Sequence, residues 1–183
     1  MRTSIFKQID NPNAFKKQLL NWSQQFREIT FLDSNVDYNK DSGYSSYDLV
    51  VAVDAFTAVK TDYTNAFEDL YEYQSRMKDW LFGYMSYDLK NDVEVLKSKN
   101  FDGLQFPDLY FFQPKKLFFL KGNQLEIQYL NMCDDEVEYD FVEILNHQSP
   151  ITNHQSPKIN QRVSKERYIE KVSKMLDYIH RGD

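Results

Sequence analysis

The sequence has little of several features that mark particular classes of protein. It holds a single cysteine, Cys133, so no disulfide can form within the chain, and no pair of cysteines is spaced for zinc. No apolar run approaches the ~20 residues that a membrane helix needs. The first residues also lack the continuous apolar core of a signal peptide. These absences predict a protein of the reducing cytoplasm without a membrane segment.

Positive charge, glycine and proline are also scarce. The chain carries 22 Lys and Arg against 28 Asp and Glu, which gives a net charge of −6. A basic face for nucleic acid is therefore not expected. Glycine and proline number five each, whereas there are thirteen tyrosines and fourteen phenylalanines. Such a chain of 183 residues is long enough and apolar enough to fold around a sizeable core.

Three segments have the apolar spacing of helices that cover a core. In residues 11–26, one stripe consists of Phe15, Leu19, Trp22 and Phe26, with Asn11 and Pro12 as a cap and first-turn pair. Residues 61–79 form the second predicted helix, and its apolar positions are Phe67, Leu70, Tyr71 and Met77. Residues 134–145 form the third, with acidic residues at the favourable N-terminal end and with Val137, Phe141 and Ile144 inward.

Strands are predicted between these helices. Residues 29–32 and 49–56 are short apolar runs, and Asp54 is expected at an exposed strand end. Gly122 and Asn123 separate two further runs and tolerate the positive φ of a tight hairpin. A hairpin favours antiparallel pairing. We therefore predict an α+β fold, in which a largely antiparallel sheet packs with helices.

The stretch 79–90, DWLFGYMSYDLK, is rich in strand-forming residues and is predicted to be a buried strand. Its one glycine, Gly83, marks a place where another backbone or a ligand comes close. The alternative is that Gly83 only relieves crowding in a core strand. A second position with two interpretations is the strand end at Asp33 and Ser34, which can bind the ammonium group of an amino acid or cap the following turn.

The pentapeptide NHQSP occurs twice between residues 146 and 160 and predicts a polar linker. His147 and His154 allow a metal interpretation, but no carboxylate or cysteine set accompanies them, and a solvated linker is the alternative. A last helix is predicted within residues 161–183. Ser164 caps it, Gly182 ends it, and its stripe consists of Ile169, Val172, Leu176 and Ile179.

Some of these segments resemble a known family. The Gly-Tyr-x-x-Tyr-Asp pattern of that family is matched by Gly83, Tyr84, Tyr87 and Asp88, and a Pro-Asp-Leu tripeptide follows at Pro107, Asp108 and Leu109. These segments resemble the N-terminal region of component I of aminodeoxychorismate synthase and of its sister, anthranilate synthase. Many members have glycines where this chain has Trp80, Leu81 and Ser86.

Two further segments carry the same resemblance. Residues 31–34 are similar to the strand that lines the tryptophan pocket of the anthranilate synthase family, which implies that Asp33 and Ser34 contact such a ligand. Residues 178–183 match Tyr-Ile-x-x-Gly-Asp, which ends the first helix of the catalytic domain, at Gly182 and Asp183. The resemblance implies an N-terminal domain at 1–145, a linker at 146–160 and the first helix of a truncated catalytic domain at 161–183.

The resemblance also implies a function for the intact protein. It would add ammonia, released from glutamine by a separate amidotransferase subunit, to chorismate, giving 4-amino-4-deoxychorismate for p-aminobenzoate and folate. The rival product is anthranilate. In the family, the catalytic and magnesium-binding residues lie downstream, so none is expected in these residues. The remaining alternatives are a non-catalytic domain for tryptophan binding and protein interaction, or a domain that only supports the catalytic sheet.

Overall fold

The computed structural model describes residues 1–35, 46–94, 96, 101–147 and 160–182. The chain divides into two compact units, residues 1–149 and 150–183. Most of the predicted linker, including His154, lies outside the described residues, as does Asp183. Within the part of the chain that is described, no helix is long and apolar enough to cross a membrane.

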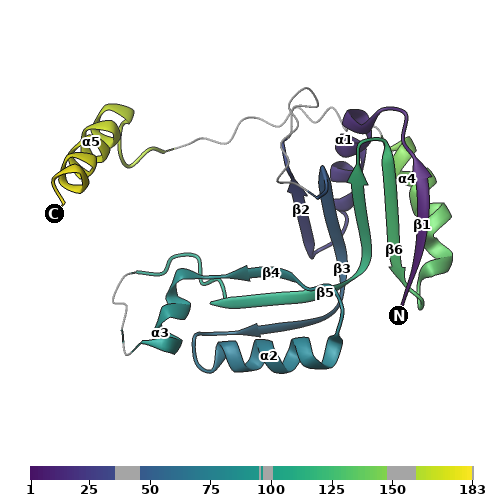
Figure 1. Ribbon diagram of the computed structural model, residues 1–183, viewed down its shortest axis with the longest axis horizontal. Coiled ribbons are helices and arrows are strands. Elements are labelled where there is room, and N and C mark those ends of the chain that lie inside the picture. The colour runs from purple at the N-terminus through teal and green to yellow at the C-terminus, as the bar shows by residue number, and fades with distance from the viewer. Residues whose placement is uncertain (36–45, 95, 97–100, 148–159, 183) are drawn as a thin grey trace. The chain divides into compact units, whose positions relative to one another are not determined.

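The first unit is built on one antiparallel sheet (Figure 1). Its strands are β1 (Arg2–Gln8), β2 (Ile29–Asp33), β3 (Leu49–Thr61), β4 (Phe82–Met85), β5 (Leu109–Lys121) and β6 (Gln124–Leu130). Its helices are α1 (Pro12–Ser23), α2 (Ala66–Met77), α3 (Lys90–Val93) and α4 (Val137–Asn146), with short 3-10 turns at Tyr87–Leu89 and Asp134–Glu136. The strand order is β1-β6-β5-β3-β2, and β4 pairs with β5. The predicted α+β class is confirmed.

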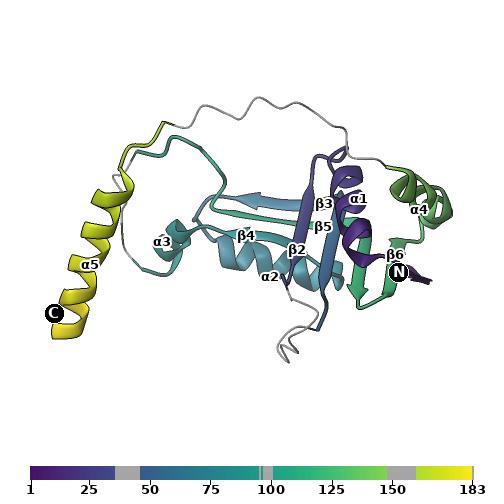
Figure 2. The same ribbon diagram turned by 90° about the horizontal axis from the view of Figure 1, so that it is seen from above.

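The long strands β3 and β5 pass through two regions of the sheet that have different neighbours. In the region that we call the β6 half, residues 116–121 of β5 pair with β6. In the region that we call the β4 half, residues 109–112 of β5 pair with β4. The register of β3 against β5 shifts between Ala55 and Thr57, which is a β-bulge. Figures 1 and 2 show both strands running from one half into the other.

Asp54 lies next to this bulge, and the prediction that it sits at an exposed strand end is wrong. Its φ is 61°, and β3 continues beyond it to Thr61. Its carboxylate lies 3.0 Å from the Nζ of Lys115 on the neighbouring strand. Aspartate tolerates the left-handed region better than most residues, so Asp54 suits the local change of direction.

Helices α1 and α4 cover the β6 half. Three members of the predicted stripe, Phe15, Leu19 and Trp22, are buried on α1, whereas Phe26 lies beyond the end of the helix and is partly buried. The Asn11 side chain accepts a hydrogen bond from the backbone N–H of Ala14 at 3.1 Å, as expected of a cap. Aromatic edges pack tightly in this core, and the Trp22 and Phe118 rings lie 5.7 Å apart, nearly perpendicular to each other. The core that joins these helices to the sheet is the largest in the chain's described part.

A buried ion cluster lies inside the β6 half. The Nζ of Lys116, on β5, donates to Asp140 at 2.5 Å and to Glu136 at 2.6 Å. Asp140 also accepts from the hydroxyl of Tyr129 at 2.8 Å. Burial alone lowers the pKa of Lys116, but the hydrogen bonds with Asp140 and Glu136 outweigh it and raise the pKa. The sequence pattern did not indicate this cluster, because Lys116 lies on a strand about 20 residues before its acidic partners.

The hairpin after β5 is confirmed. Strand β5 ends at Lys121, β6 begins at Gln124, and Gly122 has a φ of 55°. The alternating residues Leu125, Ile127 and Tyr129 are all fully buried. The side chain of Asp48 fixes the turn from outside, since its carboxylate accepts from the Gly122 backbone N–H at 2.6 Å.

Helix α2 covers the β4 half, where Leu109 and Phe111 of β5 pack in its core. The core of α1 and α4 in the β6 half includes Phe118 and Leu120 of the same strand. A separate cluster, without helix residues, joins the two halves on the side of β5 away from these helices. Among the described residues, each half therefore has helices on only one face of the sheet.

The predicted inward face of α2 is partly wrong. Phe67 and Tyr71 are 42% and 70% exposed, and the fully buried residue is Ala66 at the start of the helix. The helix begins at residue 66 because its start is fixed from outside: the carboxylate of Asp92 accepts from the backbone N–H groups of Asn65, at 2.8 Å, and Phe67, at 3.2 Å. A cap supplied from a distant segment leaves no local sequence signal.

The second unit contains one described helix, α5 (Lys165–Arg181). Ser164 caps it by accepting from the backbone N–H of Arg167 at 3.3 Å, and Gly182 ends it with a φ of 82°. Both end signals were predicted. Every residue of this helix is exposed, including those of the predicted apolar stripe.

Candidate functional site

The stretch 79–90 does not form the predicted buried strand. Only residues 82–85 form β4, and of these only Phe82 is buried. The prediction for Gly83 is confirmed, because another backbone does come close. A Cβ atom at Gly83 would overlap the carbonyl oxygen of Tyr110 and lie 2.7 Å from the Cα of Phe111. Glycine is required here by the neighbouring strand β5.

The two segments that matched the family pattern are locked together. The backbone N–H of Ser86 donates to the carbonyl oxygen of Asp108 at 2.7 Å, and its hydroxyl donates to the Asp108 carboxylate at 2.6 Å. Ser86 Oγ also accepts from the backbone N–H of Asp88 at 3.2 Å, which starts the turn at Tyr87–Leu89. Asp88 in turn pairs with Lys90 at 2.8 Å. The motif residues thus form one hydrogen-bonded corner.

An aromatic groove of about 520 Å³ adjoins this corner. Its walls include Gly83, Tyr84 and Pro107 of the motif segments, together with Tyr110 and the start of β2. The rings of Tyr84 and Tyr110 lie 6.2 Å apart. Burial and the nearby charge of Asp108 raise the pKa of Tyr84, so its hydroxyl stays protonated and able to donate.

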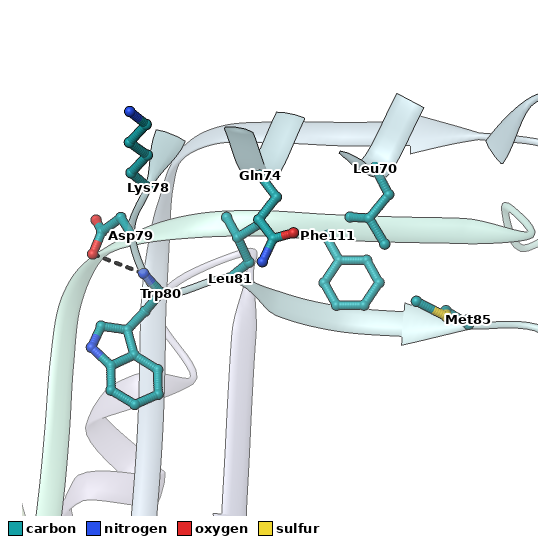
Figure 3. A pocket seen from close by; sticks show the side chains of 8 residues that line it. All are labelled: Leu70, Gln74, Lys78, Asp79, Trp80, Leu81, Met85 and Phe111. Carbon is teal, nitrogen blue, oxygen red and sulfur yellow. Dashed lines mark hydrogen bonds between the residues drawn. The ribbon is translucent and has the colours of Figure 1, made fainter. Parts of the chain in front are cut away.

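A second groove, of about 590 Å³, lies on the other side of β4 (Figure 3). The residues that line it are Leu70, Gln74, Lys78, Asp79, Trp80, Leu81, Met85 and Phe111. Asp79 is the fixed point of its wall, because its carboxylate accepts from Arg2 at 2.8 Å, from Gln113 at 2.7 Å and from the Trp80 backbone N–H at 2.8 Å. Burial raises the pKa of Asp79, but these hydrogen bonds outweigh burial and lower it.

Arg2 bonds both to Asp79 in this wall and to the edge of β5, at the residues that lie between the part paired with β4 and the part paired with β6. Besides its ion pair with Asp79, its guanidinium donates to the carbonyl oxygens of Pro114 at 2.6 Å and Lys115 at 3.2 Å. These carbonyls lie where neither β4 nor β6 pairs with β5. The Arg2 side chain is only 8% exposed. Its guanidinium supplies the hydrogen bonds that a neighbouring strand would otherwise give to these carbonyls.

Asp33 and Ser34 lie at the end of β2, away from both grooves. The Asp33 carboxylate accepts from Lys16 Nζ and from the backbone N–H of Asn35, both at 2.9 Å. Burial raises the pKa of Asp33, but these two hydrogen bonds and the charge of Lys16 outweigh it and lower the pKa. Both the hydroxyl and the backbone N–H of Ser34 donate to the Asp48 carbonyl oxygen at 3.0 Å. Lys16 is a site neighbour that no sequence pattern indicated.

Comparison with known proteins identifies the family of this chain. A family model described as chorismate binding enzyme matches residues 13–183. The chain belongs to this family. The match includes β2, β4, the corner at Ser86 and Asp108, and helix α5. A search among curated proteins found no match.

Chorismate-binding enzymes are, as a family, chorismate-utilising enzymes, and they generally use magnesium. Magnesium is held by oxygen ligands, chiefly carboxylates. Among the residues whose positions are described, no three or more histidines, cysteines, aspartates and glutamates gather where they could hold a metal ion. The strongly placed carboxylates, Asp33, Asp79 and Asp140, are each paired with a cation of the same chain. These residues do not fit a magnesium site.

Proposed function

We propose that the protein works in the cytoplasm as component I of an aminodeoxychorismate synthase. In this reaction ammonia, released from glutamine by a separate amidotransferase subunit, replaces the 4-hydroxyl group of chorismate and water leaves. The observation that carries the proposal is the family match over residues 13–183. The resemblance of residues 83–88 and 107–109 to component I supports it, and the hydrogen bond from Ser86 to Asp108 joins these two segments.

In this proposal the described residues support the reaction and do not carry it out. Their buried or hydrogen-bonded charges serve the fold: Lys116 pairs with Asp140, and Asp79 pairs with Arg2. The magnesium ion and the groups that contact chorismate belong elsewhere in the enzyme.

The test is an assay of the native gene product with chorismate, Mg²⁺ and ammonium ion. We expect 4-amino-4-deoxychorismate, identified by mass and by its conversion to p-aminobenzoate when a lyase is added. Fluorescent anthranilate would select the rival activity, in which pyruvate is eliminated as well. A protein that folds and yields neither product would contradict both proposals. Adding glutamine without ammonium should restore product only when an amidotransferase subunit is present.

A second proposal, of a binding function, concerns Asp33 and Ser34. Lys16 and Asp33 place a cation and a carboxylate 2.9 Å apart beside the Ser34 hydroxyl. Such a pair complements the carboxylate and the ammonium group of a free amino acid. We propose L-tryptophan as the ligand, as the resemblance implies. The existing Lys16–Asp33 bond would have to open, so we expect weak binding.

Calorimetry with L-tryptophan tests this site directly. Ser34→Ala should weaken binding, while Ser164→Ala, a matched change at the cap of α5, should leave the affinity unchanged. Equal and measurable affinity in all three proteins would remove Ser34 from the site. D-tryptophan is a useful control, because reversed positions of the charged groups should lower the affinity if Lys16 and Asp33 both bind the ligand.

A further inference from the structure

The β4 half of the sheet ends in a strand with an open edge. In the β6 half, β6 pairs with β5 and β1 pairs with the far side of β6. In the β4 half, β4 takes the place of β6, but none of the described residues forms a strand on the far side of β4. Because β2 pairs only with residues 49–53 of β3, the described sheet has three strands where the family motif begins and five in the β6 half.

The backbone of β4 presents hydrogen-bonding groups at this edge. Ser86 donates its backbone N–H to Asp108, and these two residues continue the register in which Tyr84 pairs with Tyr110. Antiparallel pairs alternate between hydrogen-bonded and non-hydrogen-bonded. It follows that the N–H and C=O groups of Gly83 and Met85 point away from β5, toward the open edge.

The groove of Figure 3 lies beside this edge. Helix α2 packs over β3 and β5, so it does not cover β4. Leu70 of α2, Phe111 of β5 and Met85 of β4 point into the space that remains, as Figure 3 shows. Met85 is 49% exposed. An apolar depression next to free backbone groups is the arrangement by which a sheet binds an added strand, with backbone bonds for affinity and side-chain pockets for specificity.

The usual protections of an edge strand are weak here. Charged residues, proline or a covering element normally prevent such edges from pairing with other chains. Strand β4 has the sequence FGYM, without charge or proline, and is protected only by its short length. Next to it, Trp80 is 47% exposed.

The charges around the groove favour an acidic partner. The carboxylate of Asp79 is neutralised by Arg2. Lys78, at the end of α2, is exposed and forms no ion pair with any residue that the structure describes. The uncompensated charge on the groove wall is therefore positive, which complements a carboxylate of an incoming segment.

We propose that the edge of β4 and the adjoining groove bind an extended acidic peptide segment of a partner protein as an additional strand. The backbone groups of Gly83 and Met85 bond to the segment, an apolar side chain enters the groove near Leu70 and Phe111, and a carboxylate pairs with Lys78. This site is separate from Asp33 and Ser34 and does not depend on which amine the enzyme makes.

The probe for the test is a short blocked peptide of alternating glutamate and valine, titrated into the isotope-labelled chain. We expect amide exchange to slow at Gly83 and Met85 and resonances to shift at Leu81 and Phe111. Lys78→Glu should weaken binding by roughly threefold to tenfold, the range for reversing an exposed ion pair. The matched reversal Lys121→Glu, at the exposed end of β5, should leave the affinity unchanged.

A second variant and a second measurement guard against misfolding. Met85→Pro removes an outward N–H, which an edge strand tolerates, together with a side chain of the groove wall, and should abolish binding while thermal unfolding stays close to wild type. Unchanged exchange at Gly83 and Met85 would overturn the proposal, as would equal binding of a lysine–valine peptide. Light scattering that shows a dimer which Met85→Pro dissociates would overturn it too, because the occupant would then be a second copy.

Discussion

The β6 half and the β4 half share two strands but are stabilised in different ways. Two helices bury a continuous core against the β6 half, and an ion cluster is sealed inside it. The β4 half has one covering helix and a small core of Ala66, Leu89 and Leu109. The two grooves described above, of about 520 and 590 Å³, both lie in the β4 half. The difference indicates a stable support in one half and a surface for contacts in the other.

A third cluster connects the halves. Its members are Ala52, Phe82, Phe112, Leu117 and Phe119, none of which belongs to a described helix. The exposed ring of Trp80 and the partly buried ring of Tyr47 cover it, since they lie 5.3 Å and 5.0 Å from the ring of Phe119. Because Phe82 and Phe112 come from the β4 half and Phe119 from the β6 half, this cluster packs the two halves against each other.

The largest expected effect is in the β6 half. Asp140→Ala leaves Lys116 buried with only the half-exposed Glu136 as a partner. Breaking a buried pair costs about 3–5 kcal/mol, so we expect the free energy of unfolding to fall by about 3 kcal/mol. Denaturant titration measures it. Asp135→Ala, on the exposed side of the same segment, is the matched control and should change stability by less than about 0.5 kcal/mol.

Gly83→Ala tests the β4 half. The added methyl group collides with the backbone of β5, and a backbone cannot move aside as a flexible side chain can. Overpacking of this kind costs about 1–3 kcal/mol. Hydrogen exchange should rise at Tyr84 and Tyr110 more than at Phe118. The control is Gly103→Ala, whose methyl group meets only the ring of the exposed Phe101. Equal exchange in both halves would show that they unfold as one unit.

Arg2→Ala tests the junction between the halves. Losing the buried guanidinium removes the cation beside Asp79 and a donor to two carbonyl oxygens, so we expect a cost of about 2 kcal/mol. Lys7 lies on the same strand as Arg2 and forms an exposed ion pair with Glu138 of α4. Lys7→Ala should therefore cost less than about 1 kcal/mol. A similar loss in both variants would show that burial of Arg2 contributes little.

The stability lost in Arg2→Ala should also depend on pH. The pKa of Asp79 is lower in the folded protein, so its ion pair contributes fully above the unfolded pKa and is lost as pH falls through the folded value. The stability difference between wild type and Arg2→Ala should be constant above about pH 5 and shrink below about pH 4. Denaturant titrations across this range measure it. A difference that persists at about pH 2 would show that the carbonyl contacts dominate.

Ser34→Ala should have the smallest effect on stability. The hydroxyl is exposed, and the backbone N–H of Ser34 keeps its bond to Asp48 without it. We expect a change below about 0.5 kcal/mol. Thermal unfolding measures it, and a larger loss would assign Ser34 to the structure of the turn.

The sequence predicted those parts of the fold whose signals are local. The cap at Asn11, the stripe of Phe15, Leu19 and Trp22, and the hairpin at Gly122 each depend on residues a few positions apart. Strand β1 was not predicted, because half-polar residues 2–8 become a strand only beside β6. Long-range pairing of this kind leaves no periodic pattern strong enough to recognise.

The candidate site shows the same division. The close backbone approach at Gly83 could be predicted, since glycine within a strand has few other causes. The burial of β4 was overestimated, because an apolar run such as 80–85 has the same composition in a central strand and in an edge strand. Neither the Arg2–Asp79 pair nor the Lys16–Asp33 pair could be predicted, because each depends on how distant segments meet.

The pairing of β1 with β6 has a consequence for how the protein is made. Arg2 pairs with Leu130, so this partner of the first strand is synthesised 128 residues later. At roughly 5–20 residues per second, a ribosome takes about 6–25 s to supply it. During that time β1 has no neighbour, and its polar residues, such as Thr3 and Lys7, keep it from pairing elsewhere. The junction held by Arg2 therefore closes late, after the sheet's central strands have been synthesised.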